Sequence, residues 1–324
     1  MIKYLFRHNK DYSRFNIIKQ LVQNITCKHT IYILLPFSKN QFLKYFFKRG
    51  AIINDFFISN YDTYVYDRKK ITKYNPRAWW KYCQDWVNFK FSKYLLSDTQ
   101  AHFEYWQTLF GPFLGKHFVL PVLADTSVYY PSAIEKNDDE KIKILFYGSF
   151  IPLHGVDIIL NAFHMLEKEN ISFDATIIGT GQTYKSMKLL YKKLELKNVT
   201  MDGTFIKETD LATKIRETDI VLGIFGDSKK AQSVVPNKAY QALASKKTLI
   251  TMQTQTLYEF FSDEDMVMCS NTPQALANAI KTLILNPVLM KSYQCKGYEK
   301  FLSLYEHTQK EFANFIQVID KELE

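Results

Sequence analysis

The chain has 324 residues, more than one hydrophobic core usually supports, so two domains of roughly 150 residues each are expected. Hydrophobic residues make up 47% and charged residues 23%, the proportions of an ordinary globular protein. The opening MIKYLFRHNK carries charges too early for a signal peptide, and no later run approaches ~20 apolar residues. We therefore expect a cytoplasmic protein without a membrane span.

Charge is divided unevenly along the chain. Residues 1–97 hold 18 Lys or Arg against 5 Asp or Glu, whereas residues 141–324 hold 22 against 21. The net charge is therefore +13 in the first segment and +1 in the second. A basic surplus confined to one domain indicates an anionic partner, for which a phosphorylated lipid head group, an anionic membrane or nucleic acid would all qualify.

The cysteines form no framework. Cys27, Cys83, Cys269 and Cys295 lie far apart and match no metal-ligand spacing and no paired pattern. This usage fits a reducing cytosol. No metal site is expected.

The first 135 residues alternate between strand-like and helix-like segments. Apolar runs predict strands at 2–6, at 30–35, near Phe56 and at 94–97, and helical spacing predicts helices near 15–22 and 41–47. Residues 75–94 form a further helix with a broad apolar stripe made of Trp79, Trp80, Cys83, Trp86, Val87, Phe91 and Tyr94. The favoured interpretation packs this stripe into the core. The alternative is contact with a membrane interface, suggested by the tryptophans and the surrounding Lys and Arg.

A polar linker, PSAIEKNDDEK at 131–141, separates two domains that we place at 1–135 and 141–304. Strands of the second domain are predicted at 142–147, 173–178, 198–201, 219–225 and 248–251, and helices at 156–166 and 187–194. The spacing is typical of a parallel, doubly wound, Rossmann-like sheet. Apolar residues from Phe301 to Ile319 predict a long amphipathic C-terminal helix, whose part at 305–324 we expect to complete the first domain.

Glycine turns follow the first two strands of the second domain. Ligands gather at the carboxyl ends of parallel strands, because backbone N–H groups and helix dipoles there favour anions. After the first strand comes GSFIPLHGVD, in which Gly148 allows close backbone approach and Gly155 opens a helix. The next strand ends in a second turn with Gly179 and Gly181. Glycine turns also end many strands that bind nothing.

A third segment, from Ser233 to Thr251, is more informative. Asn237, which follows Pro236, is predicted to cap a helix whose first turn bears Lys238. Gln241 lies one turn later on nearly the same face. This arrangement places an ammonium beside a phosphate and an amide beside a sugar hydroxyl. The alternative for both side chains is a solvated helix surface.

In their order and spacing, GSFIPLHGVD, IIGTGQ and PNKAYQALASKKTLIT resemble the nucleotide-binding domain of family 4 glycosyltransferases and their relatives in bacterial surface-polysaccharide clusters. The resemblance covers about residues 141–290. It implies a GT-B fold, with two Rossmann-like βαβ domains facing a central cleft. It also implies retaining, metal-independent sugar transfer from a UDP- or GDP-linked nucleotide-sugar to a glycan or lipid-linked acceptor, with no further cofactor.

The chain departs from the family pattern at several positions. Gln241 stands where members usually carry an acidic residue that contacts the ribose, and Ser233 stands where many have a second Glu near the donor sugar. The basic pair that neutralises the diphosphate in the family falls on Ser149 and His154. Neutralisation must then come from Lys238, backbone amides, His154 or an Arg of the first domain. His154 has a turn-stabilising role as its alternative.

The chemistry explains the choice of residues. As the glycosyl bond breaks, negative charge grows on the departing nucleoside diphosphate, and prepositioned N–H donors and an ammonium stabilise that charge more than the ground state. In the first domain, YDT at 61–63 with DRK at 67–69, and SDTQAH at 97–102, resemble segments of a bacterial subgroup. His102 is expected to contact the donor sugar or the acceptor hydroxyl, with a structural histidine as the alternative. Asp62 and Asp67, in a loop rich in Tyr and basic residues, could accept the acceptor's proton, or cap and pair with Arg68.

The candidate site thus has two parts. The candidate catalytic residues are His102, Lys238, Asp62 and Asp67. The candidate donor-binding residues are Gly148, Ser149, His154, Gly155, Gly179, Gly181, Pro236, Asn237 and Gln241.

Other functions stay open. A non-catalytic GT-B partner would use the same cleft to bind a glycan or another protein, because Ser233, Ser149 and Gln241 replace charged family residues. An epimerase with the GT-B fold would share the architecture. Nucleic-acid binding rests on the basic first domain alone, without an RRM, helix-turn-helix or zinc signature, so we expect no nucleic-acid partner. The same basic surplus favours peripheral attachment to the inner face of an anionic membrane.

Overall fold

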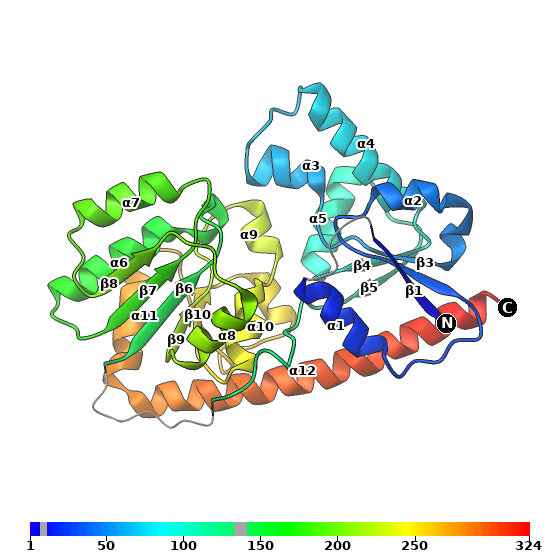
Figure 1. The fold of residues 1–324 in the computed structure, drawn as a ribbon. Coiled ribbons are helices and arrows are strands. Elements are labelled where there is room, and N and C mark those ends of the chain that lie inside the picture. Colours follow the sequence, from blue (N-terminus) through cyan, green and yellow to red (C-terminus); the bar gives the residue numbers. More distant parts are fainter. Residues whose placement is uncertain (7–11, 133–140) are drawn as a thin grey trace. The chain divides into compact units, whose positions relative to one another are not determined.

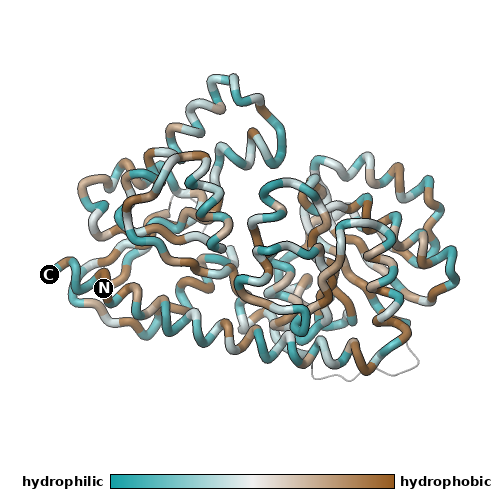
Figure 2. Tube along the Cα trace, turned by 180° about the vertical axis from the view of Figure 1, so that it is seen from behind, coloured by the Kyte–Doolittle hydropathy of each residue, from teal (hydrophilic) through white to brown (hydrophobic). Residues whose placement is uncertain are grey.

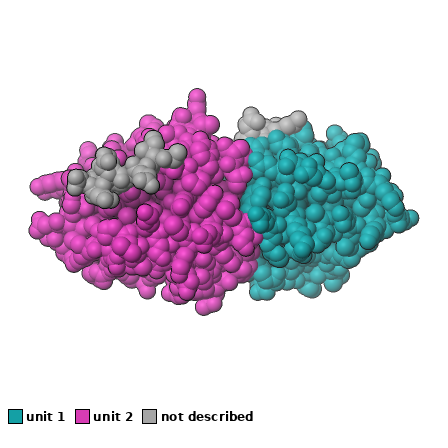
Figure 3. All heavy atoms as spheres, turned by 90° about the horizontal axis from the view of Figure 1, so that it is seen from below, with its two compact units in different colours: residues 1–123, 305–324 teal, residues 124–304 magenta. Residues whose placement is uncertain are grey.

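The computed structural model describes residues 1–6, 12–132 and 141–324. They form two compact units, one of residues 1–123 with 305–324 and one of residues 124–304, which Figure 3 colours separately. The linker expected at 131–141 falls mostly, over 133–140, outside the described residues. The domain limits at 135 and 141 therefore stay predictions.

The first unit is built on a parallel sheet whose five strands follow one another in chain order, β1-β2-β3-β4-β5 (Figure 1). Its sheet thus has no point at which the strand order reverses. Its elements are β1 Ile2–Leu5, α1 Ser13–Val22, β2 Ile31–Leu34, α2 Asn40–Lys44, the 3-10 turn η1 Phe46–Ala51, β3 Ile52–Asp55, α3 Asn60–Asp62, the π-helical turn η2 Thr63–Asp67, α4 Pro76–Phe91, β4 Tyr94–Ser97, α5 Gln100–Phe110 and β5 Lys116–Val119.

Helices cover both faces of this sheet. Leu95 of β4 packs in a buried cluster with Phe89 of α4 and Trp106 of α5. The preceding Tyr94 lies with its ring 6.2 Å from that of Phe315, in the C-terminal part of the long helix α12 Pro287–Glu322. Successive strand residues point to opposite faces, so α4 and α5 cover one face and the end of α12 covers the other (Figure 1). The C-terminal helix, which the sequence predicted to dock on the protein, packs here against the sheet of the first unit.

Helix α4 corrects the sequence prediction in part: the expected core stripe is divided, because Trp86 and Val87 pack against buried clusters whereas the tryptophans nearer the start of the helix do not. Its buried residues include Asp85, Asn88 and Phe89, whereas Trp79 and Trp80 of the expected core stripe are 61% and 72% exposed. The predicted stripe assumes that the apolar face of a helix turns inward. Here the polar side chains of Asp85 and Asn88 turn inward beside Phe89, since the first unit supplies partners for them.

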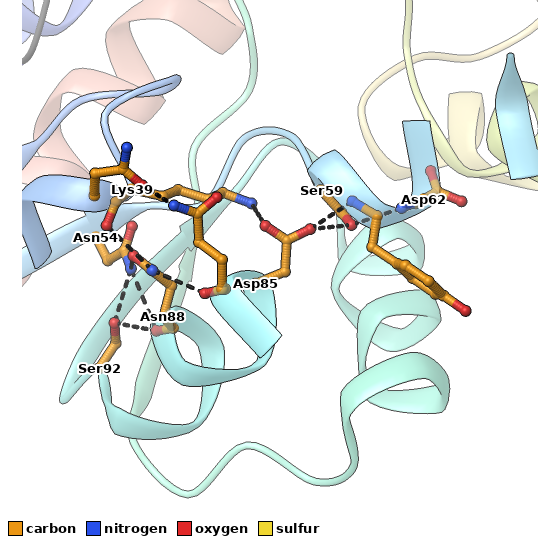
Figure 4. A network of polar contacts seen from close by, with 10 residues as sticks. Lys39, Asn54, Ser59, Asp62, Asp85, Asn88 and Ser92 are labelled. Carbon is orange, nitrogen blue, oxygen red and sulfur yellow. Dashed lines mark hydrogen bonds and ion pairs between the residues drawn. The ribbon is translucent and has the colours of Figure 1, made fainter. Parts of the chain in front are cut away.

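Figure 4 shows these partners. The Asp85 carboxylate pairs with the buried ammonium of Lys39, and it accepts hydrogen bonds from the Ser59 hydroxyl at 2.7 Å and the Tyr61 backbone N–H at 2.8 Å. The Asn54 amide donates to the Ser92 hydroxyl at 2.9 Å, at the end of the same helix. A buried polar group is stable when its hydrogen bonds are satisfied, so this network holds α4 against the sheet.

The second unit is a doubly wound parallel sheet with strand order β11-β10-β9-β6-β7-β8. Chain order reverses between β6 and β9, which are hydrogen-bonded neighbours. Its elements are β6 Lys143–Tyr147, η3 Pro152–His154, α6 Val156–Lys168, β7 Asp174–Ile178, α7 Tyr184–Lys193, β8 Val199–Asp202, α8 Glu208–Arg216, β9 Ile220–Leu222, α9 Lys229–Ser233, α10 Asn237–Ala244, β10 Thr248–Met252, η4 Gln255–Glu259, β11 Val267–Cys269 and α11 Pro273–Leu285.

The sequence prediction for this unit is confirmed in outline. All five predicted strands and both predicted helices are present, although the strand expected at 219–225 is only Ile220–Leu222. Apolar strands lie inside each unit, seen as brown tube in Figure 2. The long C-terminal helix is confirmed too, with Phe312, Ile316 and Ile319 fully buried. Every helix in the described parts of the chain is too short or too polar to cross a bilayer.

Replacing Asp85 by Asn tests the network under α4. The free energy of unfolding should fall by about 3–5 kcal/mol, because the Lys39 ammonium stays buried after losing the opposing charge. Chemical denaturation measures the change. The matched control is Lys281→Met, which removes an exposed ion pair with Glu169 and should change stability by less than about 1 kcal/mol. Equal, small effects of the two substitutions would contradict the role of the network.

Candidate functional site

The carboxyl edge of the second sheet brings Lys238 to the point where strand order reverses. Lys238 lies in the first turn of α10, and its ammonium donates to the carbonyl oxygen of Gly223, just after β9, at 3.1 Å. The ammonium also lies 3.8 Å from the ring centre of Phe146 in β6. The residue is only 5% exposed, and no carboxylate of the described residues forms an ion pair with it. The site therefore holds a buried cation that no carboxylate in the described parts of the chain balances.

Two other predicted residues lie beside Lys238. A Cβ atom placed on Gly148 would be 3.0 Å from Cε1 of His154 and 3.4 Å from Cε of Lys238. The His154 ring faces the Ser149 carbonyl oxygen through Nδ1. Gly148 has φ of +141°, a conformation open to glycine. The turn after β6 is thus packed directly on the lysine, as the sequence motifs predicted.

Burial shapes the charges here. It holds the pKa of Lys238 well below its usual range, because an ammonium loses its hydration in this position. Burial, and then the nearby Lys238 charge, hold the pKa of His154 well below its usual range, although the hydrogen bond to Ser149 opposes this. His154 is consequently neutral at pH 7. Because Nδ1–H donates to the Ser149 carbonyl oxygen, Nε2 carries the lone pair, so the ring can accept a hydrogen bond from a hydroxyl but brings neither a donor nor a positive charge to a phosphate.

The remaining predicted glycines are required by packing of the chain on itself. A Cβ on Gly155 would lie 2.6 Å from the backbone carbon of Phe225, and one on Gly181 would lie 2.8 Å from the backbone nitrogen of Phe150. A Cβ on Gly179 would overlap the carbonyl oxygen of Gly148. These glycines bring the loops after β6, β7 and β9 into contact. Their close approach to backbone is sufficient to explain them without a ligand.

Gln241 is held from both sides by tyrosines. Its amide oxygen accepts a hydrogen bond from the Tyr147 hydroxyl at 2.6 Å, and its amide nitrogen donates to the Tyr129 hydroxyl at 2.8 Å. The Tyr129 hydroxyl in turn donates to Glu208 at 3.3 Å. The solvated-surface alternative is therefore wrong for Gln241. Its amide belongs to an internal chain of hydrogen bonds, which its one-turn offset from Lys238 did not reveal.

The mouth of this region is more open. Ser149 and Asn237 are exposed, and Pro236 and Ser233 are partly and fully buried, respectively. The prediction that Asn237 caps α10 is wrong: the helix starts at Asn237, Pro236 precedes it as the capping residue, and no side chain caps the helix. Proline at this place supplies neither a side-chain acceptor nor an N–H donor. The first N–H groups of α10 are thus left without a side-chain cap.

In the first unit, His102 lies at the start of α5, just after β4. Its Nδ1 atom is 2.7 Å from a carboxylate oxygen of Asp98, and its ring lies 4.2 Å from that of Trp106. The side chain is buried, and Nε2 has no hydrogen-bond partner among the described residues. The Asp98 carboxylate fixes a proton on Nδ1, so Nε2 carries the lone pair. This orientation is that of a histidine prepared to accept a hydrogen bond.

Asp62 and Asp67 lie in a short helix and a π-helical turn, where the sequence analysis expected a loop. Asp62 ends the short helix α3, and Asp67 ends the π-helical turn η2, and both are buried. Asp62 accepts a hydrogen bond from the Tyr105 hydroxyl at 2.7 Å. Single π-helical turns occur often at functional sites. Here both carboxylates point into the interior of the first unit.

The sequence analysis did not predict a buried ion pair at the carboxyl end of β3 in the first unit. Arg14 of α1 binds both carboxylate oxygens of Asp55, at 3.0 and 3.1 Å, and donates to the carbonyl oxygens of Leu120 and Pro121. Burial raises the pKa of Asp55, and the Arg14 charge lowers it. The sequence analysis also did not identify Asp98 as the partner of His102. The spacing of four residues across the start of a helix is the signal that could have indicated this pair. Nowhere in the described parts of the chain do three or more His, Cys, Asp or Glu gather as metal ligands would.

Residues 132–300 match the protein family described as Glycosyl transferases group 1, which is more than half of the chain. The chain belongs to the group 1 glycosyl transferase family. A curated relative, an uncharacterised glycosyltransferase (MJ1178) of Methanocaldococcus jannaschii, is 27% identical over 165 residues, which are 48% of this chain and 42% of the relative. The chain thus spans about two fifths of the length of this relative.

Solved structures similar to this group 1 family member share its fold. WaaG, a glycosyltransferase involved in lipopolysaccharide biosynthesis, superposes with a TM-score of 0.68 at 12% identity, over 98% of this chain and 99% of that one. Alr3699/HepE of Anabaena, solved with UDP and glucose, gives 0.65 at 12% identity, over 97% and 98%. The GT-B fold class predicted from the sequence is confirmed by these matches.

The lowered pKa of Lys238 predicts how the free energy of unfolding depends on pH in this family member. In the unfolded chain the lysine binds its proton up to its ordinary pKa, whereas the folded chain releases it at lower pH. Unfolding therefore takes up a proton, and the stability contributed by this residue rises with pH, by at most about 1.4 kcal/mol per pH unit. In Lys238→Met this contribution to the pH dependence of the free energy of unfolding is absent. Denaturation at pH 7 and pH 9 should show the variant more stable relative to the wild type at pH 7 than at pH 9.

The exposed Lys229 of α9 provides the matched control, since Lys229→Met should leave the difference from wild type independent of pH. A pH-independent difference for Lys238→Met as well would mean that burial does not disfavour the ammonium.

Proposed function

We propose that this family member transfers a sugar from a nucleoside diphosphate sugar to an acceptor, using Lys238 to receive the charge of the leaving diphosphate. One observation carries the proposal: a buried ammonium, without a carboxylate partner among the described residues, lies beside the glycine turn at the strand-order reversal. A charge buried in this way becomes favourable when an anion binds next to it. The uncapped N-terminus of α10 favours an anion at the same place.

The electrostatics suit departure of a diphosphate. Lys238 and the N–H groups of the turn stand in place before charge develops, so they need no reorganisation when the glycosyl bond breaks. We assign Ser149, His154, Asn237 and the turn at Gly148 to the donor side, with Nε2 of neutral His154 as an acceptor for a hydroxyl of the sugar nucleotide. A retaining, metal-independent reaction is proposed on the family resemblance. HepE has the same fold and was solved with UDP and glucose, so UDP is the first nucleotide to test before GDP.

On the acceptor side we assign His102, oriented by Asp98, to contact the donor sugar or the acceptor hydroxyl through Nε2. The buried Nε2 atom without a partner supports this role. Of the two predicted bases, Asp62 accepts a hydrogen bond from the Tyr105 hydroxyl, and we keep both Asp62 and Asp67 as candidate bases. The acceptor class that we propose is a glycan or a lipid-linked sugar.

A second candidate, a non-catalytic partner that binds a glycan or a protein, is favoured by one observation. The Gln241 amide, at the position where the family has its ribose-contacting carboxylate, is engaged by Tyr147 and Tyr129. Donor hydrolysis by the purified chain, abolished in Lys238→Met, would argue against this candidate.

Nucleotide binding tests the main proposal. Titration calorimetry should detect binding of UDP, GDP or CMP, weakened at least tenfold by Lys238→Met and unchanged by Lys229→Met. Because a bound diphosphate restores the ammonium, binding should take up a proton from buffer and weaken as pH rises. The heat of binding should therefore vary with the ionisation enthalpy of the buffer. Absence of binding by all three nucleotides would remove the proposal.

We further propose that the basic first unit holds the protein peripherally at the inner, anionic face of a membrane, where a lipid-linked acceptor would lie. The net charge of +13 over residues 1–97 supports it. Such attraction acts over about one Debye length and is screened by salt.

Salt dependence tests this attachment. The chain should cosediment with anionic vesicles at about 0.05 M salt and be largely released at about 0.5 M salt, because the Debye length falls severalfold. Neutral vesicles serve as the control and should bind little at either concentration. Binding that ignores salt would contradict an electrostatic attachment.

A further inference from the structure

The segment between α3 and the middle of α4 combines exposed aromatic rings with basic side chains and no acid. Residues 68–84 contain six basic residues and no Asp or Glu. The carboxylates that border the segment, Asp67 and Asp85, are both buried. Tyr74 is 79% exposed, and Trp79 and Trp80 are the exposed tryptophans already described. We call residues 68–84 the aromatic-basic segment.

The fold presents this segment outward. Figure 1 shows α3, α4 and the chain between them projecting beyond the sheet of the first unit. Asn75 caps α4 by accepting from the Arg77 N–H at 2.9 Å, and Pro76 occupies the first turn, so the helix begins firmly at the projecting end. From its middle to its end, the helix is held by the polar contacts of Asp85, Asn88 and Ser92 (Figure 4). The rings of Trp79 and Trp80 are therefore offered on a rigid helix, and Tyr74 lies in the turn just before it.

Turning the tryptophans outward is unfavourable in water. Large exposed apolar side chains that lie close together mark a surface that binds another surface. Tryptophan and tyrosine are suited to the boundary between lipid head groups and acyl chains, because their rings are apolar and their N–H or O–H groups stay wet. Lysine and arginine in the same segment are suited to anionic head groups. Each basic residue near the surface strengthens binding to an anionic membrane on the order of fivefold.

We propose that the aromatic-basic segment is the part of the chain that enters the interface of an anionic lipid bilayer, with Trp79, Trp80 and Tyr74 as the inserted side chains. Charge complementarity selects this partner over a neutral one, since Lys69, Lys70, Lys73 and Arg77 are exposed and the segment contains no Asp or Glu. The inference rests on the peripheral attachment proposed above and names the surface that makes it. It does not depend on the donor site.

The test uses the full chain and vesicles of phosphatidylcholine, with or without about one third phosphatidylglycerol. Trp79→Ser with Trp80→Ser should weaken binding to the anionic vesicles at least tenfold, and its matched control, Phe205→Ser, should not, although Phe205 is 90% exposed in the second unit. Lys69→Gln with Lys70→Gln and Lys73→Gln should weaken binding on the order of 100-fold. Gln replacements of the exposed Lys185, Lys188 and Lys192 on α7 control for net charge and should have a much smaller effect.

Fluorescence gives a second measurement. Tryptophan emission of the wild type should shift to shorter wavelength on anionic vesicles, and the shift should be lost in the double Trp variant, whose remaining Trp86 and Trp106 are partly and fully buried. Nucleotide titration of the same variants should be unchanged, which separates failure of this inference from failure of the donor site.

Three outcomes would overturn the inference. Undiminished vesicle binding by the double Trp variant would leave attachment electrostatic, without insertion of this segment. Equal losses in the α7 control would show that total charge, and not this surface, decides binding. Concentration-dependent self-association of the chain that disappears in the double Trp variant, without vesicle binding by the wild type, would assign the surface to a second copy of the chain.

Discussion

The Lys238 ammonium reaches from the first turn of α10 to the carbonyl oxygen of Gly223 and lies against the ring of Phe146, almost wholly removed from water. Burial of an ammonium is unfavourable by several kcal/mol unless an opposite charge or strong hydrogen bonds offset it. One carbonyl and one ring face offset it in part. The loops around the lysine conform to this arrangement, since the turn at Gly148 packs on its side chain and the Gly179 turn packs on Gly148. The sheet edge is thereby prepared for an anion.

The first unit treats its buried charges differently. Arg14 and Asp55 share two hydrogen bonds, and Lys39 faces Asp85, so each buried cation there has a carboxylate of the chain itself. These pairs satisfy structural requirements: they hold α1 and α4 to the sheet. Lys238 has no carboxylate partner among the described residues, which distinguishes it from the paired cations of the first unit. His102 shows the same distinction on a smaller scale, because Asp98 satisfies one ring nitrogen and leaves the other without a partner.

The same interior pairing explains the surface of α4. With Asp85 and Asn88 bound to partners inside the first unit, the first turns of the helix keep Trp79 and Trp80 outside. An aromatic face then remains outside, next to the most basic stretch of the chain. The features behind the two proposals thus lie in different units: a desolvated cation in the second, and exposed aromatic rings among many cations in the first.

The sequence by itself determined the parallel α/β class, the strands and helices of the second unit, and the gathering of Gly148, His154 and Lys238. These follow from periodicity and from the rule that the carboxyl ends of parallel strands meet at one edge, both of which are local or topological. It could not determine which face of α4 is buried, because a polar face turns inward only when residues distant in the chain, such as Lys39 and Ser59, meet its side chains. Nor could it show that Gln241 is held by Tyr129 and Tyr147, or that Asp62 folds inward to Tyr105. Such pairings join side chains far apart in the sequence, and only the tertiary structure decides which of them meet.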